Sequence, residues 1–455
     1  MMQVAHLSGT GQSFTMIQNP TLANSDLYMQ STSATRWTTL TTLLLGVTHW
    51  ASWSVIVVLL AKSNLSLDPS QLMLLVGLAG VSGAAFRFVG IFLGRLLGSW
   101  KPAATNVLLL GLSLLSWQAF SLFDVSYVNL MGLAALSGVG CMMFAPAFDL
   151  TRRDKETERL PMSMSLVIGM MIFAMFTAQL IIPFLSTWQA EFMQSGLILE
   201  RSSGHFFSRV DAGQPIMLST VSAVWMFVFA TMALLSIGVA WLSPKSAPSE
   251  KTQSDSQLLR NAHVWYCSIL YNMTFGSFIG FAMVLPLVLE LVFGYSTLIL
   301  VWMAPFIALL ARPFGRWLAG IFGGAVVTQI SLLLMIVFGA VAGWYLYLAQ
   351  NDTAELYFEP FFISMMGLVF TSALGNGSVV VTMTKVFPRA YTHKVLTWAG
   401  TVAMLGAVYL PFRFTIALES QSLDMVFVDF VVFYLAGVLL NGWMYLRKHA
   451  QFYNP

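Results

Sequence analysis

Residues 83–90 read Gly-Ala-Ala-Phe-Arg-Phe-Val-Gly, and residues 309–315 read Leu-Leu-Ala-Arg-Pro-Phe-Gly. Each stretch places one arginine, Arg87 or Arg312, deep inside an apolar run long enough to cross a bilayer. A lone guanidinium in hydrocarbon is costly unless it meets an anion, a buried carboxylate or a water-filled cavity, or snorkels to the surface. No Asp or Glu lies mid-span to act as partner, so the two arginines predict a site for an anion.

The two arginine stretches belong to a longer internal correspondence. Gly98 follows Arg87 and Gly323 follows Arg312 at the same interval, where each helix should reach water. Gly138-Val139-Gly140 corresponds to Gly375-Asn376-Gly377, and both are followed by an arginine at one spacing. Such repeats predict two related halves, each supplying part of one site at their interface.

The composition is that of a polytopic membrane protein, since 57% of the 455 residues are hydrophobic, 9% are charged and the mean hydropathy is +0.76. This excludes a soluble enzyme. The net charge of +3 gives no nucleic-acid footprint. Cys141 and Cys267 both lie in apolar spans and indicate packing residues rather than a disulfide or a metal site.

Apolar segments predict an all-α fold of twelve transmembrane helices in two pseudo-symmetric six-helix bundles. The predicted spans are 38–61, 70–97, 103–123, 127–149, 162–186, 215–242, 263–289, 295–320, 326–349, 359–384, 394–417 and 425–446. The predicted domains are a flexible N-terminal tail (1–36), a first bundle (37–242), a polar linker (243–262), a second bundle (263–447) and a C-terminal tail (448–455).

The distribution of Lys and Arg predicts a multi-pass inner-membrane protein with both termini in the cytoplasm. The loops on the inner side then hold most of the basic residues, and Arg316 is counted among them. Loops on the outer side hold Lys62 and two other basic residues. Arg413 lies near the outer end of its span and is predicted to snorkel toward Glu419.

Several uncharged residues are candidates for the same site. Tyr271 and Phe275 are four residues apart, so they share a helical face and can present a hydroxyl donor and an aromatic wall to one cavity. The alternative is that they only pack. Gly375 and Gly377 are typical of close helix approach, and the amide of Asn376 between them favours a binding role.

His49 is the one histidine clearly within a span, and a titrating histidine there could couple transport to protons. The alternative is a neutral histidine that packs between helices, because no carboxylate relay accompanies it. Nothing in the sequence resembles a nucleotide-binding loop, a metal-ligand cluster or a nucleophile with its base. Neither catalysis nor a cofactor is therefore expected, and a gradient, exchange or protons would drive transport.

These residues resemble the nitrate/nitrite porters of the major facilitator superfamily. The resemblance rests on the two arginine helices, on residues 271–281, on 312–315 leading to 322–324, and on 375–378. It implies that Arg87 and Arg312 clamp a planar anion and that Tyr271 and Phe275 enclose it. It also implies that Phe144 acts as an aromatic lid.

The sequence departs from the family in its glycine signatures. In residues 164–174 only Gly169 remains, and the related signature in span eleven is reduced to Gly400, Gly406 and Pro411. We expect these glycines, with Gly375 and Gly377, to serve helix packing and gating.

The sequence therefore predicts a monomeric secondary transporter of nitrate and nitrite that works by alternating access in a lipid bilayer. The absence of a buried carboxylate favours nitrate/nitrite antiport over proton symport. Two alternatives stay open, namely a transporter of another small oxyanion or monocarboxylate and a membrane sensor that binds an anion without moving it.

Overall fold

The computed structural model describes residues 33–121, 125–151, 160–188, 197–204, 209–243, 258–294 and 297–455. Most of the predicted tail 1–36 and of the predicted linker 243–262 lies outside these residues. The first helix begins at Ser33, a few residues before the predicted end of the tail at residue 36, and the predicted division into domains stays a prediction. Residues 33–38 contain no glycine or proline that would break a helix, so the helix can begin before the apolar run does.

In the first half of the chain the elements are α1 (Ser33–Ala51), α2 (Trp53–Ala61), α3 (Pro69–Leu96), η2 (Gly98–Trp100), α4 (Lys101–Ser121), α5 (Tyr127–Leu136), η3 (Ser137–Met143), α6 (Phe144–Thr151), α7 (Leu160–Leu185), β1 (Ser203–Gly204), β2 (Arg209–Val210) and α8 (Leu218–Leu242). In the second half they are α10 (Ala262–Tyr271), η4 (Asn272–Gly276), α11 (Ser277–Phe293), η5 (Thr297–Ile299), α12 (Met303–Phe322), α13 (Gly324–Asn351), η6 (Ala354–Tyr357), α14 (Phe358–Val386), α15 (Arg389–Ala403), α16 (Leu405–Glu419), α17 (Met425–Asn441) and η7 (Gly442–Leu446).

Eleven segments of the described chain are helical, long and apolar enough to cross a membrane. They confirm the predicted all-α membrane protein and coincide with eleven of the twelve predicted spans. The remaining span contains α12, which carries Arg312 and Arg316 and is less hydrophobic for that reason. That α12 crosses the bilayer stays a prediction.

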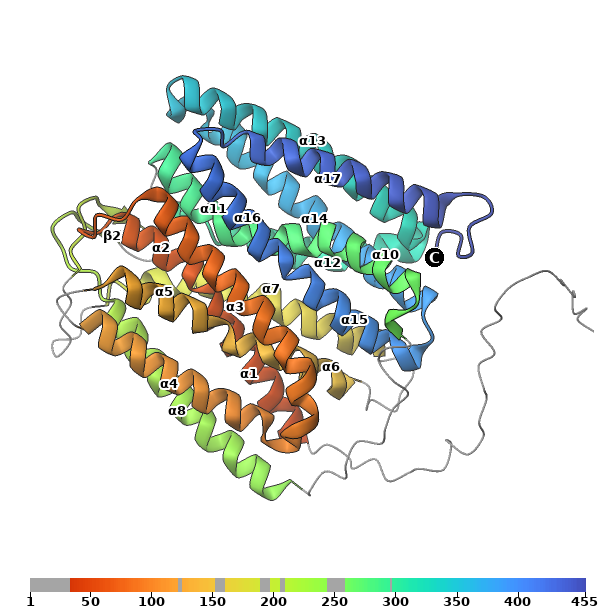
Figure 1. Ribbon diagram of the computed structural model, residues 1–455, viewed down its shortest axis with the longest axis horizontal. Helices are drawn as coiled ribbons and strands as arrows, with labels where there is room; N and C mark the ends of the chain where they lie inside the picture. Colours follow the sequence, from red (N-terminus) through yellow and green to blue (C-terminus); the bar gives the residue numbers. More distant parts are fainter. Residues whose placement is uncertain are drawn as a thin grey trace, which may run out of the picture. The chain divides into compact units, whose positions relative to one another are not determined.

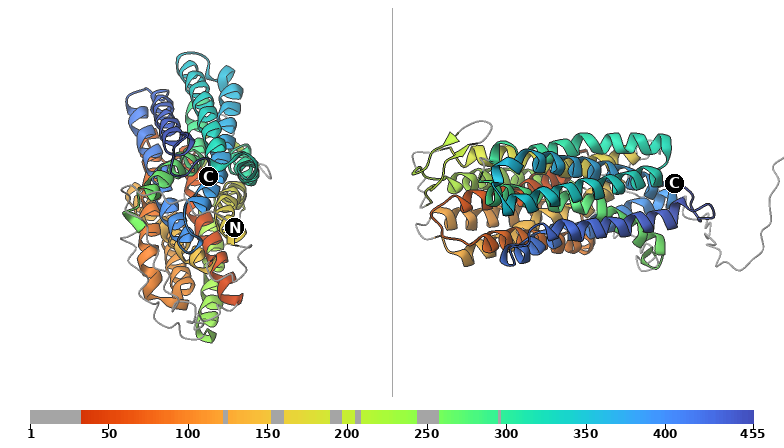
Figure 2. Two further views of the ribbon diagram at one scale, coloured as in Figure 1. Left: turned by 90° about the vertical axis from the view of Figure 1, so that its right-hand side faces the viewer. Right: turned by 90° about the horizontal axis from the view of Figure 1, so that it is seen from above.

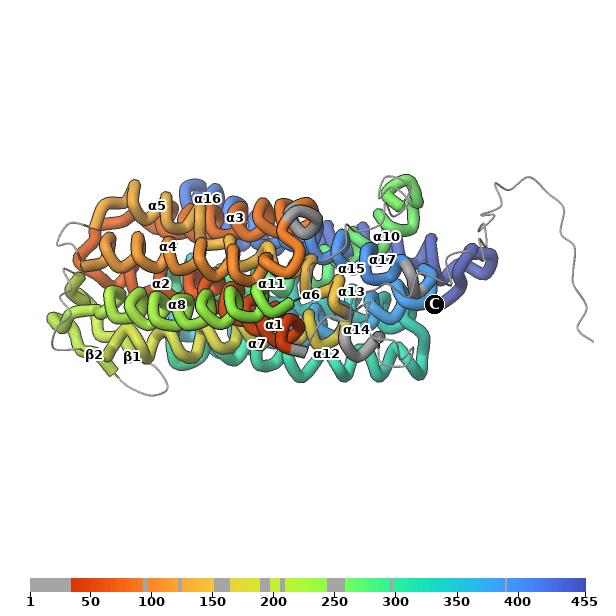
Figure 3. Tube along the Cα trace, turned by 90° about the horizontal axis from the view of Figure 1, so that it is seen from below, coloured from red at the N-terminus to blue at the C-terminus, as the bar shows by residue number. Residues whose placement is uncertain are grey.

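The helices lie side by side, with α4 and α8 at one side and α13 and α17 at the opposite side (Figure 1). Between them, helices of the first half contact helices of the second, as α3 with α16, α2 with α11 and α7 with α12. The α7–α12 contact is visible in Figure 3. The β1–β2 hairpin and residue 455 lie at opposite ends of the helices (Figure 2).

Four predicted spans are interrupted near their middle. The first breaks at Ser52, between α1 and α2, and the eleventh at Met404, between α15 and α16. The fourth contains the 3₁₀ segment η3, and the seventh contains the π-helical turn η4. Irregular turns of this kind are frequent at functional sites because they free backbone groups and re-aim side chains.

The two arginine helices end as their glycines predict. Gly98 has φ +52° just after α3, and Gly323 has φ +91° just after α12, a backbone region that favours glycine. The predicted C-terminal tail folds back onto the second of these ends. The Asn454 side chain accepts from Val326 N and donates to Phe322 O, and the Pro455 carbonyl accepts from Gly324 N.

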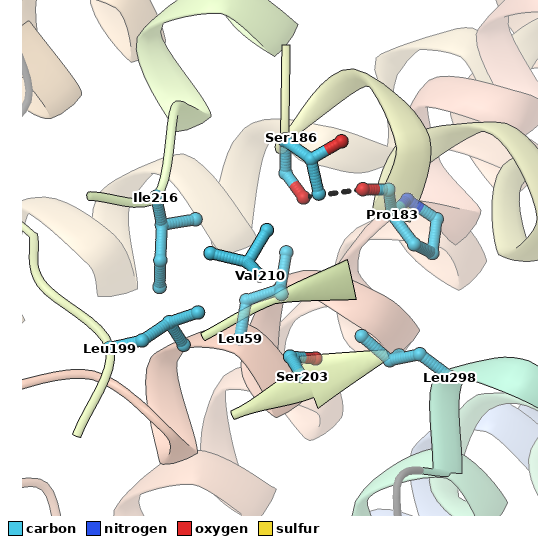
Figure 4. Close-up of a pocket in the computed structure, with 9 residues that line it drawn as sticks. Leu59, Pro183, Ser186, Leu199, Ser203, Val210, Ile216 and Leu298 are labelled. Atoms are coloured by element: carbon cyan, nitrogen blue, oxygen red, sulfur yellow. Dashed lines mark hydrogen bonds between the residues drawn. The ribbon is translucent and has the colours of Figure 1, made fainter. Parts of the chain in front are cut away.

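The described part of the connection between α7 and α8 contains the β1–β2 hairpin, which lies at one end of the helices (Figure 2). Its strands pair antiparallel, Ser203 with Val210. A small cavity beneath the hairpin is lined mainly by apolar side chains such as Leu59, Leu199 and Leu298 (Figure 4). The hydroxyl-bearing residues Ser186, Thr187 and Ser203 also line the cavity, and its lining includes no charged side chain.

Candidate anion-binding site

Arg87 lies on α3 with 1% of its surface exposed. Its Nη1 donates to the Gly400 carbonyl at 2.6 Å, and its Nη2 lies 2.9 Å from Met171 Sδ. The guanidinium carbon sits 4.0 Å from the centre of the Phe144 ring, within the range of a cation–π interaction. Arg87 therefore reaches from the first half of the chain to α15 in the second.

Arg312 lies on α12 with 5% of its surface exposed, and it reaches from the second half of the chain to the first. Its Nε donates to Asn376 Oδ1 at 2.6 Å within the second half. Its Nη1 donates to the Ser165 carbonyl at 3.1 Å and approaches Ser165 Oγ at 3.3 Å, and Ser165 belongs to α7 of the first half.

Tyr271 connects the two arginines. It is fully buried at the end of α10, directly before η4, and is close enough to interact electrostatically with both Arg87 and Arg312. Its ring centre lies 5.4 Å from that of Phe275, and its hydroxyl lies beside Asn376. The structure thus brings Arg87, Arg312, Tyr271 and Asn376 together, with Phe275 and Phe144 at their edges.

The site has donors to spare and no negative charge of its own. Arg87 Nε, Tyr271 Oη and Asn376 Nδ2 are buried and make no hydrogen bond of standard geometry with the described residues, although Tyr271 and Asn376 lie beside each other. Neither guanidinium has a carboxylate partner in the described chain. Buried donors and cations without acceptors are costly, so an acceptor that carries negative charge would stabilise this site.

Phe144 packs tightly between the two halves of the chain. A Cβ placed on Gly400 would lie 2.4 Å from the Phe144 ring, so the glycine is what allows the ring to reach α15. Phe148 packs edge-on against Phe144, with ring centres 4.9 Å apart. Phe144 therefore lies over Arg87 and touches the second half at once.

Four of the five predicted glycines are tightly packed: Gly377 and Gly406 lie against backbone atoms, and Gly375 and Gly400 lie against side chains. A Cβ added to Gly375 would lie 2.6 Å from Thr274 Cγ2. A Cβ added to Gly377 would lie 2.3 Å from Arg312 O, and one added to Gly406 would lie 2.0 Å from Gly276 O. For Gly169 the packing prediction is wrong in this conformation, because a Cβ there would meet no atom within 4 Å. A role of Gly169 in gating stays a prediction.

His49 lies outside the contacts of the two arginines. Its ring packs edge-on against Trp225 and Phe229, with centres 5.5 and 5.7 Å away. It lines a small cavity together with Ser113, Ser222 and other residues of the first half, and no arginine or tyrosine lines that cavity. Proton coupling through His49 stays a prediction.

The sequence reasoning missed three charged contacts. Arg316 lies within α12, not in a loop, and donates to Ser165 Oγ at 3.1 Å; its spacing of four from Arg312 was the available signal. Lys62 is buried in an ion pair with Glu290 at 3.1 Å, although it was counted as a loop residue. The prediction that Arg413 turns toward Glu419 is wrong, because Asp429 on the adjacent α17 offers a closer carboxylate.

The helices are arranged in the major facilitator fold. The crystal structure of a D-xylose-proton symporter superposes with a TM-score of 0.61 over 90% of this chain and 96% of that one, at 16% identity. At that identity the likeness concerns the fold alone. It confirms the predicted fold class, while the count of twelve transmembrane helices stays a prediction.

Full-length sequence relatives point to one group of transporters. The chain is 29% identical to the probable nitrate/nitrite antiporter NarK2 of Thermus thermophilus, over 92% of this chain and 93% of the relative. It is 26% identical to the nitrate/nitrite transporter NarU of Salmonella typhimurium, over 91% and 92%. No family model matches the chain. The relatives confirm the resemblance read from the sequence, and they are transporters, not enzymes.

Proposed function

We propose that this protein is a secondary transporter that moves nitrate and nitrite across the inner membrane by alternating access. The names of its full-length relatives support this substrate class. The observation that carries the proposal is the set of buried donors, Arg87, Arg312, Tyr271 and Asn376, which converge without a carboxylate among them. Two guanidinium forks suit a planar oxyanion, which accepts two parallel hydrogen bonds from each.

The crossing contacts suggest how binding and movement are linked. Arg87 of the first half bonds to Gly400 of the second, and Arg312 of the second half bonds to Ser165 of the first. If the halves rock apart on one side, one of these neutral acceptors leaves and its guanidinium gains a free donor for the anion. Bound anion would then replace the lost acceptors in the transition between states.

Exchange of nitrate for nitrite fits the site better than proton symport. Among the described residues, no carboxylate or histidine forms a hydrogen bond or an ion pair with Arg87 or Arg312 and could carry a proton with the anion. His49 keeps symport as the alternative. The topology proposed here has both termini in the cytoplasm, and one copy of the chain contains every residue of the site, which favours a monomer in the bilayer.

Purified protein in liposomes tests the proposal. Vesicles loaded with nitrite and diluted into nitrate should exchange the two anions without a change of luminal pH. Acidification that tracks uptake would favour symport. A competition panel with formate and other small oxyanions tests the alternative substrates, and tight nitrate binding without any flux would favour the sensor.

A further inference from the structure

Arg316 extends the cationic site by one helical turn. It follows Arg312 by four residues on α12, so both guanidiniums project from one face of that helix. The two are close enough to interact electrostatically. Like charges so placed repel each other, and a bound anion would relieve that repulsion.

Both arginines converge on one oxygen atom. Ser165 Oγ accepts from Arg316 Nη1 at 3.1 Å and lies 3.3 Å from Arg312 Nη1. A hydroxyl oxygen has two lone pairs and can accept from both cations. Ser165 lies on α7 of the first half, so this oxygen is brought to the cations by the partner half and leaves with it.

We propose that Arg312 and Arg316 form a second station for the transported anion, and that Ser165 Oγ marks the place of one anion oxygen. The proposal rests on the proposed function, because it takes nitrate and nitrite as the ligands. When α7 moves away from α12, both guanidiniums stay on α12 and their shared acceptor is lost. An anion leaving Arg87 can then be handed to Arg316, one turn nearer the end of α12 at Gly323.

If the second station exists, substitutions of Arg316 and of Ser165 should have different effects. Arg316→Gln removes a cation from the exit step but leaves the donors around Tyr271, so we expect a fall of about tenfold in the maximal exchange rate. The dissociation constant of nitrate should change by less than about threefold, since the central donors remain. Ser165→Ala removes the competing oxygen, and nitrate should therefore bind more tightly than to the wild type.

The experiment measures nitrate binding to purified protein by titration calorimetry and nitrate/nitrite exchange in liposomes for both variants. Arg447→Gln is the matched control, because Arg447 is an exposed cation that stacks on Trp443, 4.6 Å from the ring centre. Thermal stability is recorded for each variant to separate a folding defect from a transport defect.

The outcomes separate this proposal from the proposed function. Wild-type protein that neither binds nor exchanges nitrate overturns both. Active wild type with an Arg316→Gln variant that exchanges at the wild-type rate overturns the second station alone. Equal losses of exchange in Arg316→Gln and Ser165→Ala, with weaker binding in both, would show that their contact only ties α7 to α12 and would also overturn it.

Discussion

Arg87 and Arg312 are buried to a similar degree but are held by different acceptors. Arg87 meets a carbonyl, a thioether and an aromatic face, whereas Arg312 meets an amide oxygen and a serine. All of these groups are neutral, and a thioether is a weak acceptor. Arg87 is therefore the less satisfied cation and the one that gains more from a bound anion.

Replacing either arginine with lysine should reduce nitrate/nitrite exchange by more than about tenfold. Lysine keeps the charge but offers a point donor in place of the planar fork. Exchange in liposomes measures the effect, and Arg413→Lys serves as the control because its ion pair with Asp429 needs only a cation. Wild-type exchange in Arg87→Lys and Arg312→Lys would remove the clamp from consideration.

Tyr271→Phe tests the buried hydroxyl that lies beside Asn376 and near both guanidiniums. The ring stays against Phe275, but one donor to the anion is lost, so we expect nitrate affinity to fall about tenfold. Titration calorimetry gives the dissociation constant. Tyr434→Phe is matched to it, because the Tyr434 hydroxyl is also buried without a regular partner, and it lies on α17. Equal effects of the two changes would argue against a special role for Tyr271.

At the scale of the element, the two halves repeat a packing device that follows each arginine. Gly90 comes three residues after Arg87, and a Cβ there would lie 2.2 Å from Met142 O in η3. Gly315 comes three residues after Arg312, and a Cβ there would lie 2.1 Å from Leu374 O in α14. Each arginine helix therefore presses its backbone onto the fourth predicted span of its own half, which fixes the depth of the guanidinium.

Gly90→Ala and Gly315→Ala should each destabilise the protein by about 1–3 kcal/mol, because overpacking forces two backbones apart. The measurement is the thermal unfolding of purified protein with and without nitrate. Gly111→Ala is the control, since a Cβ there meets nothing within 4 Å and alanine is the better helix former. If the two variants unfold at the same temperature as the control, the helices approach less closely than described.

The sequence is informative about the helices and about the two central arginines, because both signals are local. Apolar runs define the spans, and a lone Arg87 or Arg312 within such a run stands out without knowledge of its neighbours. The turn η4 could not be predicted, since residues 272–276 have no proline and their hydrogen-bond shift depends on α14 and α16. Ser165 carries no signal because serines are common in membrane helices.

The pairing of charged residues at the ends of spans also could not be predicted from the sequence. Lys62 and Glu290 each look like residues at a membrane boundary, where either could face water. Only the packing of α2 against α11 decides that they meet. For the same reason Arg413 takes Asp429 as its partner instead of the nearer-in-sequence Glu419.

For the whole molecule, the halves are held together at more than one level along the helices. Lys62 follows α2 in the first half, and Glu290 lies on α11 in the second, with 2% and 5% of their side chains exposed. Arg312 and Arg316 meet Ser165 elsewhere along the interface, and Phe144 reaches Gly400. Alternating access requires that some of these contacts break while others hold.

The Lys62–Glu290 pair should act as a latch between the halves. Removing one partner of a buried ion pair leaves an uncompensated charge and costs about 3–5 kcal/mol. We therefore expect Lys62→Met and Glu290→Gln each to lower the unfolding temperature of the purified protein by several degrees. The double variant Lys62→Met with Glu290→Leu should recover much of the loss, because no charge is then left buried.

A double-mutant cycle on the unfolding temperature distinguishes the latch from two independent charges. Arg209, paired with Asp211 in an exposed contact, supplies the control, since Arg209→Gln should have little effect on stability. Effects that add without coupling would mean that Lys62 and Glu290 do not depend on each other. In that case the contact between the first and second halves at this level would rest on the apolar packing of α2 against α11 alone.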